Sequence, residues 1–168
     1  MKLREKLVVM IIACLAVVLG GVGAFTIQRN AAMTTAAKTE SAGMVAESIK
    51  ESMHVFGEIG DMEALEDYVD GVRHMEGLTD VRAVRSEAVV ADFDEREGGL
   101  PQDDLDRQVL ASGEPLTVVD HDAHTIRTLL PLTTQESCLD CHETEVGSVL
   151  GVASVSVSTA DADRAKTV

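Results

Sequence analysis

The feature that most constrains this chain is a run of uncharged, mainly apolar residues at positions 7–27. As an α-helix, its 21 residues span roughly 30 Å, the thickness of the hydrocarbon core of a bilayer. Three basic residues, Lys2, Arg4 and Lys6, precede the run, and such residues favour the cytoplasmic side of a membrane helix. We therefore expect a cytoplasmic tip at 1–6, a single transmembrane signal anchor at 7–27, and the rest of the chain on the outer side of the membrane.

A cleaved signal peptide is the alternative interpretation of this segment. Signal peptides usually have an apolar core of only about 7–15 residues, although Val22-Gly23-Ala24 offers a small-residue cleavage site here. The sequence that ends at Cys14 loosely resembles a lipoprotein box, but the apolar run continues well beyond it. The length of the run favours a retained anchor with Cys14 inside the membrane.

The rest of the chain is strongly acidic. Residues 29–168 carry 28 Asp and Glu against 11 Lys and Arg, which gives a formal charge of −17. Such a surface repels the phosphates of nucleic acids and anionic lipids, so neither is an expected partner. These residues, about 140 in number, are enough for one domain with its own core. Aromatic residues make up only 2% of the chain, so a cofactor pocket must have mainly aliphatic walls.

Helical patterns follow the anchor directly. Residues 28–57 contain no proline, and apolar residues recur at helical spacing between Val45 and Phe56. We expect a juxtamembrane helix over 28–57 that continues from the anchor. A break at 57–61 should then lead into a second helix over 62–75.

Strand patterns dominate the remainder. Short valine-rich segments with turn residues between them predict about five antiparallel strands. A helix capped by Asp103 or Asp104 and ended by Gly113 interrupts them. The fold class is therefore α+β, with a long N-terminal transmembrane and juxtamembrane helix followed by an antiparallel-sheet domain over 58–160. The predicted strands cover 81–83, 87–93, 115–119, 125–131 and 149–158, and residues 161–168 are expected to begin an exit helix.

The sequence Cys138-Leu139-Asp140-Cys141-His142 carries the chemistry of this domain. It is the C-x-x-C-H signature of covalent c-type haem attachment. Two thiols at this spacing can each add to one haem vinyl group, and the adjacent imidazole then serves as the proximal iron ligand. We expect one haem c, bound covalently by Cys138 and Cys141 with His142 on the iron.

Other interpretations of the two cysteines stay open: a dithiol redox pair, a disulfide, or half of a zinc site. A thioredoxin-like pair needs a strand-to-helix context, whereas a polar loop precedes Cys138. A zinc site needs further ligands, and the remaining cysteine, Cys14, lies in the apolar run.

Several segments of the chain, spread over about residues 45–160, carry a resemblance to one family. They are Val81–Ser86, Phe93, Pro101-x-Asp103, Val109–Gly113, Leu130-Pro131-Leu132, the C-x-x-C-H motif, Gly147 and Val149-Leu150-Gly151-Val152. Together they are similar to the haem-c-containing PAS-like or Cache-like periplasmic sensor ectodomains of bacterial chemoreceptors and sensor histidine kinases. The resemblance implies a PAS-like domain with one c-type haem loop, outside a bacterial inner membrane. In that family a second transmembrane helix and a cytoplasmic signalling module normally follow.

The same resemblance implies that a methionine from the first helical region is the distal iron ligand, and Met53 matches this position best. His54 is a less favoured alternative because it is expected on the polar face of its helix. An open distal site is a further possibility. Weaker candidate ligands are His74, Met75, His121 and His124. Three arginines are candidates to pair with haem propionates, or are exposed strand charges: Arg82, Arg85 and Arg127.

The expected function is a membrane-anchored periplasmic haem sensor that responds to redox state or a small gaseous ligand, in chemotaxis or two-component signal transduction. The alternative is a membrane-anchored monohaem c-type cytochrome for electron transfer, and a Cache-type sensor without haem is a third possibility. No phosphate-binding loop or hydrolytic constellation is apparent, so no enzymatic activity is expected. The long helix favours a homodimer. If the chain is complete at residue 168, a signalling or redox protein must act as a partner in trans.

Overall fold

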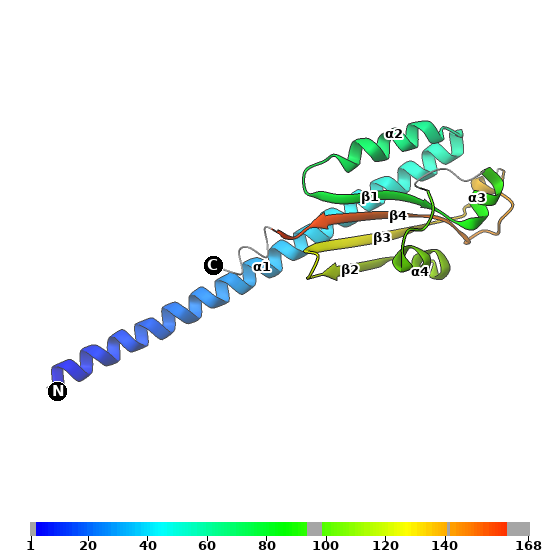
Figure 1. The fold of residues 1–168 in the computed structure, drawn as a ribbon. Coiled ribbons are helices and arrows are strands. Elements are labelled where there is room, and N and C mark those ends of the chain that lie inside the picture. The colour runs from blue at the N-terminus through cyan, green and yellow to red at the C-terminus, as the bar shows by residue number, and fades with distance from the viewer. Residues whose placement is uncertain (1–2, 94–98, 141, 161–168) are drawn as a thin grey trace.

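The computed structural model describes residues 3–93, 99–140 and 142–160. Within these residues, four antiparallel strands form one sheet in the order β1-β4-β3-β2. The α+β class and the long N-terminal helix predicted from the sequence are confirmed (Figure 1). The elements are α1 (Leu3–Ile59), α2 (Met62–Arg73), β1 (Leu78–Arg85), α3 (Glu87–Phe93), α4 (Asp104–Ser112), β2 (Leu116–Asp120), β3 (Thr125–Thr133), the 3-10 helix η1 (Glu136–Asp140) and β4 (Val149–Ser158).

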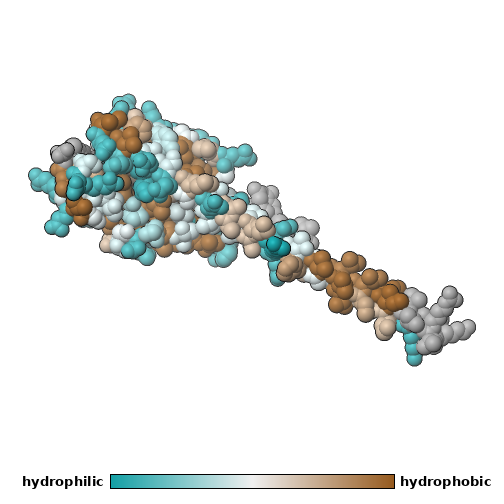
Figure 2. All heavy atoms as spheres, turned by 180° about the vertical axis from the view of Figure 1, so that it is seen from behind, coloured by the Kyte–Doolittle hydropathy of each residue, from teal (hydrophilic) through white to brown (hydrophobic). Residues whose placement is uncertain are grey.

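Helix α1 has two parts with different surroundings. Its first part projects away from the domain, and its second part lies along the sheet (Figure 1). Among the described residues, α1 is the one helix long and apolar enough to cross a membrane. Apolar side chains of the projecting part, such as Val17 and Leu19, are exposed, and they form the brown stretch in Figure 2. Because a large exposed apolar surface is unfavourable in water, this part of α1 is suited to a bilayer.

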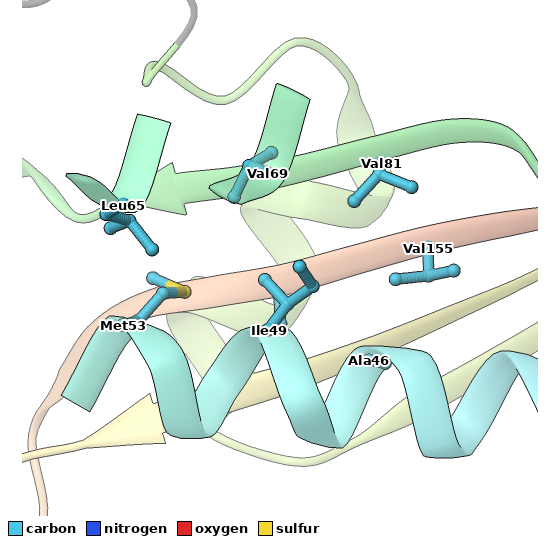
Figure 3. Packing of buried hydrophobic residues seen from close by; sticks show 8 residues of the cluster. Ala46, Ile49, Met53, Leu65, Val69, Val81 and Val155 are labelled. Atoms are coloured by element: carbon cyan, nitrogen blue, oxygen red, sulfur yellow. The ribbon is translucent and has the colours of Figure 1, made fainter. Parts of the chain in front are cut away.

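The second part of α1 and helix α2 cover one face of the sheet. Successive strand residues point to opposite faces, so the odd-numbered Val81 and Val155 meet Ile49 of α1. Met53 and Leu65 extend this packing between the two helices, as Figure 3 shows. The whole cluster comprises Ala46, Ile49, Met53, Leu65, Val69, Val81, Ala153 and Val155.

The opposite face is covered by α4 and holds buried charges. Even-numbered residues of β1 and β4 pack with Val109 in an apolar cluster. Beside it, Arg82 Nη1 donates a 3.0 Å hydrogen bond to Asp106, and Arg127 donates hydrogen bonds to both Asp103 and Asp106. Asp106 is fully buried, so this set of ion pairs fixes α4 on the sheet.

Asp103 also caps α4, as the sequence predicts. Its side chain accepts the backbone N–H groups of Leu105 and Asp106, each at 3.1 Å. Burial alone would raise the pKa of Asp103. Hydrogen bonds from Arg127 and from the backbone of Asp106, with the charges of Arg127 and Arg82, outweigh burial and lower this pKa to about 2. At the other end, Gly113 has the predicted left-handed conformation, with φ +67°.

The predicted strand over 87–93 is wrong, because these residues form helix α3. Ser86 starts the helix: its Oγ accepts the N–H of Val89 at 3.4 Å, and its carbonyl accepts the N–H of Val90 at 3.1 Å. Valines favour strands locally, but the cap at Ser86 overrides that preference. The other predicted strands form, with shifted ends. The predicted exit helix at 161–168 lies outside the described residues.

Candidate functional site

A cavity of about 930 Å³ lies between the end of α1, α2, the end of β1, α3 and the loop that precedes β4. This volume is within the roughly 300–1,000 Å³ of pockets that hold cofactors and comparable small molecules. Cys138 and His142 of the C-x-x-C-H motif line the cavity, together with Met53 and His54 of α1. The structure thus brings these four predicted site residues to one place, and Cys141 lies outside the described residues.

Cys138 lies on η1 in the β3–β4 connection, and His142 follows this short helix. The N–H of Cys138 donates to the carbonyl of Gln135, and the N–H of His142 donates to the carbonyl of Cys138, both at 3.0 Å. The second bond brings the backbone of His142 close to Cys138, and both residues line the cavity.

The base of this loop is closed by a pair of polar residues. The N–H of Thr134 donates to the carbonyl of Ser148 at 2.8 Å, and their hydroxyl groups lie 2.9 Å apart. Gly147, whose φ of +89° favours glycine, donates its N–H to the carbonyl of Thr134 at 3.0 Å. These contacts hold the motif at the end of the sheet where β3 finishes and β4 begins.

Met53 of α1 lines the same cavity. It is largely buried, at 8% exposure, and it packs over Gly151 of β4. A Cβ atom on Gly151 would lie 2.8 Å from Met53 Cε and 2.6 Å from the carbonyl oxygen of Val84, closer than real Cβ contacts. The missing side chain at Gly151 therefore makes the space that Met53 fills.

His54 also lines the cavity, contrary to the expectation that it lies on a polar, solvated face. Its side chain is 19% exposed, and Nε2 lies 3.7 Å from Glu58 Oε1. After the turn at Gly60, α2 runs back along α1, so the flank of α1 beside Met53 becomes an inner wall. The sequence periodicity of α1 alone does not contain this information.

The remaining candidate ligands do not reach the cavity. His74 and Met75 are exposed at the end of α2. His121 and His124 lie in the β2–β3 turn, which is at the other end of the sheet, because Thr125 pairs with Ser158.

Of the three arginines expected near a ligand, the structure brings only Arg85 to the cavity. For Arg82 and Arg127 the propionate interpretation is wrong, since both are engaged by α4 on the opposite face. Because successive strand residues point to opposite faces of a sheet, the sequence alone could have placed Arg82 and Arg85 on different faces. Sequence reasoning missed Arg73 of α2, which lines the cavity with the acidic residues Glu58, Glu66 and Asp70.

Among the described residues, no group of three or more His, Cys, Asp and Glu is arranged to hold a metal ion.

Comparison with known proteins gives one informative result. No protein-family model matches the chain, and no curated protein matches it. Among solved structures, the cyanobacterial heme-protein Tll0287 matches with a TM-score of 0.53 and 14% identity, over 71% of this chain and 95% of that chain. At this identity the likeness shows the fold alone: this chain has a fold similar to that of a heme-protein.

Proposed function

We propose that this chain is a membrane-anchored c-type haem protein whose domain, outside a bacterial inner membrane, senses redox state or a small gaseous ligand. The observation that carries the proposal is the convergence of Cys138, His142, Met53 and His54 on one cavity. The likeness in fold to a heme-protein supports it. In this proposal Cys138 and Cys141 form the thioether links, and His142 is the proximal ligand.

The residues that line the cavity fit haem. Its walls are mainly aliphatic, and they include Cys138 and His142, two of the three residues that the C-x-x-C-H motif supplies to a covalent haem. Two arginines offer positive charge for the propionates. The aliphatic lining is given by Met62, Leu65, Val69, Ala83, Val89, Leu132 and Leu150. A haem held here would supply a reversible change in iron charge and axial ligation.

Met53 is the distal ligand that we favour, and His54 is the second choice. Met53 is held by Gly151 and by the core cluster of α1 and α2, so its sulfur has a fixed place. A thioether ligand favours the reduced iron and raises the potential. This difference between the oxidised and reduced states is what a sensor needs, because a conformational change follows only from differential interactions.

Helix α1 supports sensing over simple electron transfer. The same continuous helix carries Met53, His54 and the apolar membrane-suited segment. A shift at Met53 would therefore act directly on the segment that reaches the membrane, with residues 1–6 in the cytoplasm. We further propose that the sensor is not an enzyme, pairs through α1 as a homodimer, and acts in chemotaxis or two-component signalling.

A monohaem electron carrier is the second candidate function. Two apolar side chains of the motif loop, Leu139 and Val146, are 43% and 60% exposed. Apolar groups beside a cofactor loop suit a transient redox partner. These exposed side chains concern the motif loop alone, whereas α1 connects the cavity to the apolar segment. We therefore favour the sensor.

An optical experiment tests the haem and its ligands. The chain is produced with a c-type maturation system and recorded oxidised, reduced, and as the pyridine haemochrome. We expect a c-type haemochrome and a six-coordinate spectrum whose methionine signature disappears in Met53→Ala. No haemochrome would contradict the proposal, and an unchanged spectrum in Met53→Ala would contradict Met53 ligation.

Distance measurements separate sensing from electron transfer. Spin labels at the exposed Met44 of α1 and Val119 of β2 report the position of α1 on the sheet. A sensor should show different distances in the oxidised and reduced states. Identical distances, together with no binding of gas, would favour the electron carrier.

A further inference from the structure

Two arginines stand at the edge of the cavity. Arg85 ends β1 and Arg73 ends α2, and both line the cavity beside its apolar walls. We infer that Arg85 and Arg73 form an anion-binding edge that holds the two carboxylates of a flat apolar ligand, and that Glu66 is the counter-ion which Arg85 exchanges for one of them. The inference deepens the proposed haem function and rests on it, because haem propionates are such carboxylates.

Arg85 is held in place by the backbone of the segment before α4. Its side chain is only 13% exposed, and its main-chain N–H donates to the carbonyl of Gly99 at 2.7 Å. A Cβ on Gly99 would lie 3.3 Å from Arg85 Nε and 3.5 Å from Cζ. The bare backbone of Gly99 therefore lets the guanidinium lie close against it.

Arg73 is held by β1 on one edge of its guanidinium. Nε and Nη2 donate to the carbonyl of Val81 at 3.3 and 3.1 Å. Nη1 lies on the other edge, 3.6 Å from Asp70 Oδ1. The side chain of Arg73 is 49% exposed, so Arg73 is more accessible to solvent than the largely buried Arg85.

Each cavity arginine lies near a carboxylate of α2, at a longer distance than the arginines of the opposite face. Arg85 Nη2 is 3.4 Å from Glu66 Oε1, and Glu66 is 54% exposed. On the opposite face, by contrast, Arg127 meets Asp103 and Asp106 at 2.5 Å. Charge-assisted hydrogen bonds are normally about 2.7–2.9 Å long, so the 3.4 Å contact between Arg85 Nη2 and Glu66 Oε1 is longer than an optimal one. Guanidinium groups suit this role because their fork binds carboxylates with two parallel bonds.

The test uses the full chain in detergent with Cys138→Ala and Cys141→Ala, so that porphyrin binds without covalent attachment. The probes are zinc protoporphyrin IX and its dimethyl ester, titrated by their fluorescence. We expect the diacid to bind roughly tenfold more tightly than the ester, as one net charge-assisted bond implies. Arg85→Gln should remove most of this preference and Arg73→Gln part of it, each measured as the ratio of the two affinities within one variant.

Two further variants make the test specific. Arg107→Gln removes the same charge from an exposed position on α4, where Arg107 pairs with Asp104, and should change neither affinity. Glu66→Gln removes the competing counter-ion and should increase the preference for the diacid severalfold.

The outcomes separate this inference from the proposed function. Equal affinity of the parent chain for the two porphyrins, or a preference that survives in the Arg85→Gln, Arg73→Gln double variant, overturns the inference and leaves the haem proposal standing. Failure of the parent to bind either porphyrin, with no covalent haem on the chain that keeps its cysteines, overturns both.

Discussion

Arg82 and Arg85 lie three residues apart on β1, yet they face opposite sides of the sheet and have different surroundings. Arg82 is 6% exposed and shares the fully buried Asp106 with Arg127, beneath α4. Arg85 borders a cavity of about 930 Å³ and meets Glu66 at 3.4 Å. One face of the sheet is filled and its charges are paired, whereas the end of the other face is hollow.

The two faces of the sheet therefore have different roles. Buried charges are tolerated when they are paired and hydrogen-bonded, and the α4 face meets this condition. The cavity face leaves space and looser pairs at the end where the C-x-x-C-H loop lies. We therefore expect changes on the α4 face to alter stability, and changes on the cavity face to alter the bound cofactor.

The largest effect is expected from Asp106→Ala on the filled face. The variant leaves Arg82 and Arg127 without their buried carboxylate, which should cost about 3–5 kcal/mol of the free energy of unfolding. Denaturant titration measures this change in the free energy of unfolding. The control is Asp104→Ala, which breaks the exposed pair with Arg107 and should cost about 0–1 kcal/mol. Equal losses of the free energy of unfolding in the two variants would contradict the claim that the buried ion pairs of α4 matter more than its exposed pair.

An intermediate effect is expected from Gly151→Ala, which tests the hollow face. The new methyl group must displace Met53 or the backbone of Val84, which should cost about 1–3 kcal/mol and alter the optical spectrum of the bound cofactor. Gly71→Ala is the matched control, because an added Cβ there meets nothing within 4 Å and α2 should gain about 0.5–1 kcal/mol. A normal spectrum in Gly151→Ala would show that Met53 is not part of the site.

The smallest effect on stability is expected from the charge of Asp103, because its lowered pKa makes the free energy of unfolding depend on pH. Because the folded-state pKa of about 2 lies below the ordinary aspartate pKa of 3.8, the ionised group contributes stability that is complete above about pH 4. That contribution is lost as the pH falls towards 2. Asp103 is 40% exposed, so the contribution should be no more than about 1 kcal/mol.

Asp103→Asn keeps a side chain that can cap α4 but removes the charge. Unfolding measured between pH 2 and 6 should show a shallower loss of stability in this variant than in the parent. The same pH slope in both proteins would contradict the assignment of this pKa to Asp103.

The sequence predicted the α+β class because its signals are local: the apolar run, the Asp103 cap, the Gly113 stop and the alternation in β4. The prediction failed at 87–93, where the cap at Ser86 outweighs strand-favouring valines. It also failed to place His54 and to identify Arg73, because both depend on α2 running back along α1. The set of Cys138, His142 and Met53 could be predicted, since motif chemistry and family resemblance need no tertiary information.

Covalent attachment of haem at the C-x-x-C-H motif is the central claim, and intact-mass spectrometry of the chain matured with a c-type haem system tests it most directly. The account predicts one haem added per chain, located on the peptide that contains Cys138 and Cys141 and absent from the Cys138→Ala, Cys141→Ala variant. The mass of the bare polypeptide, with the two thiols free or joined in a disulfide, would contradict it.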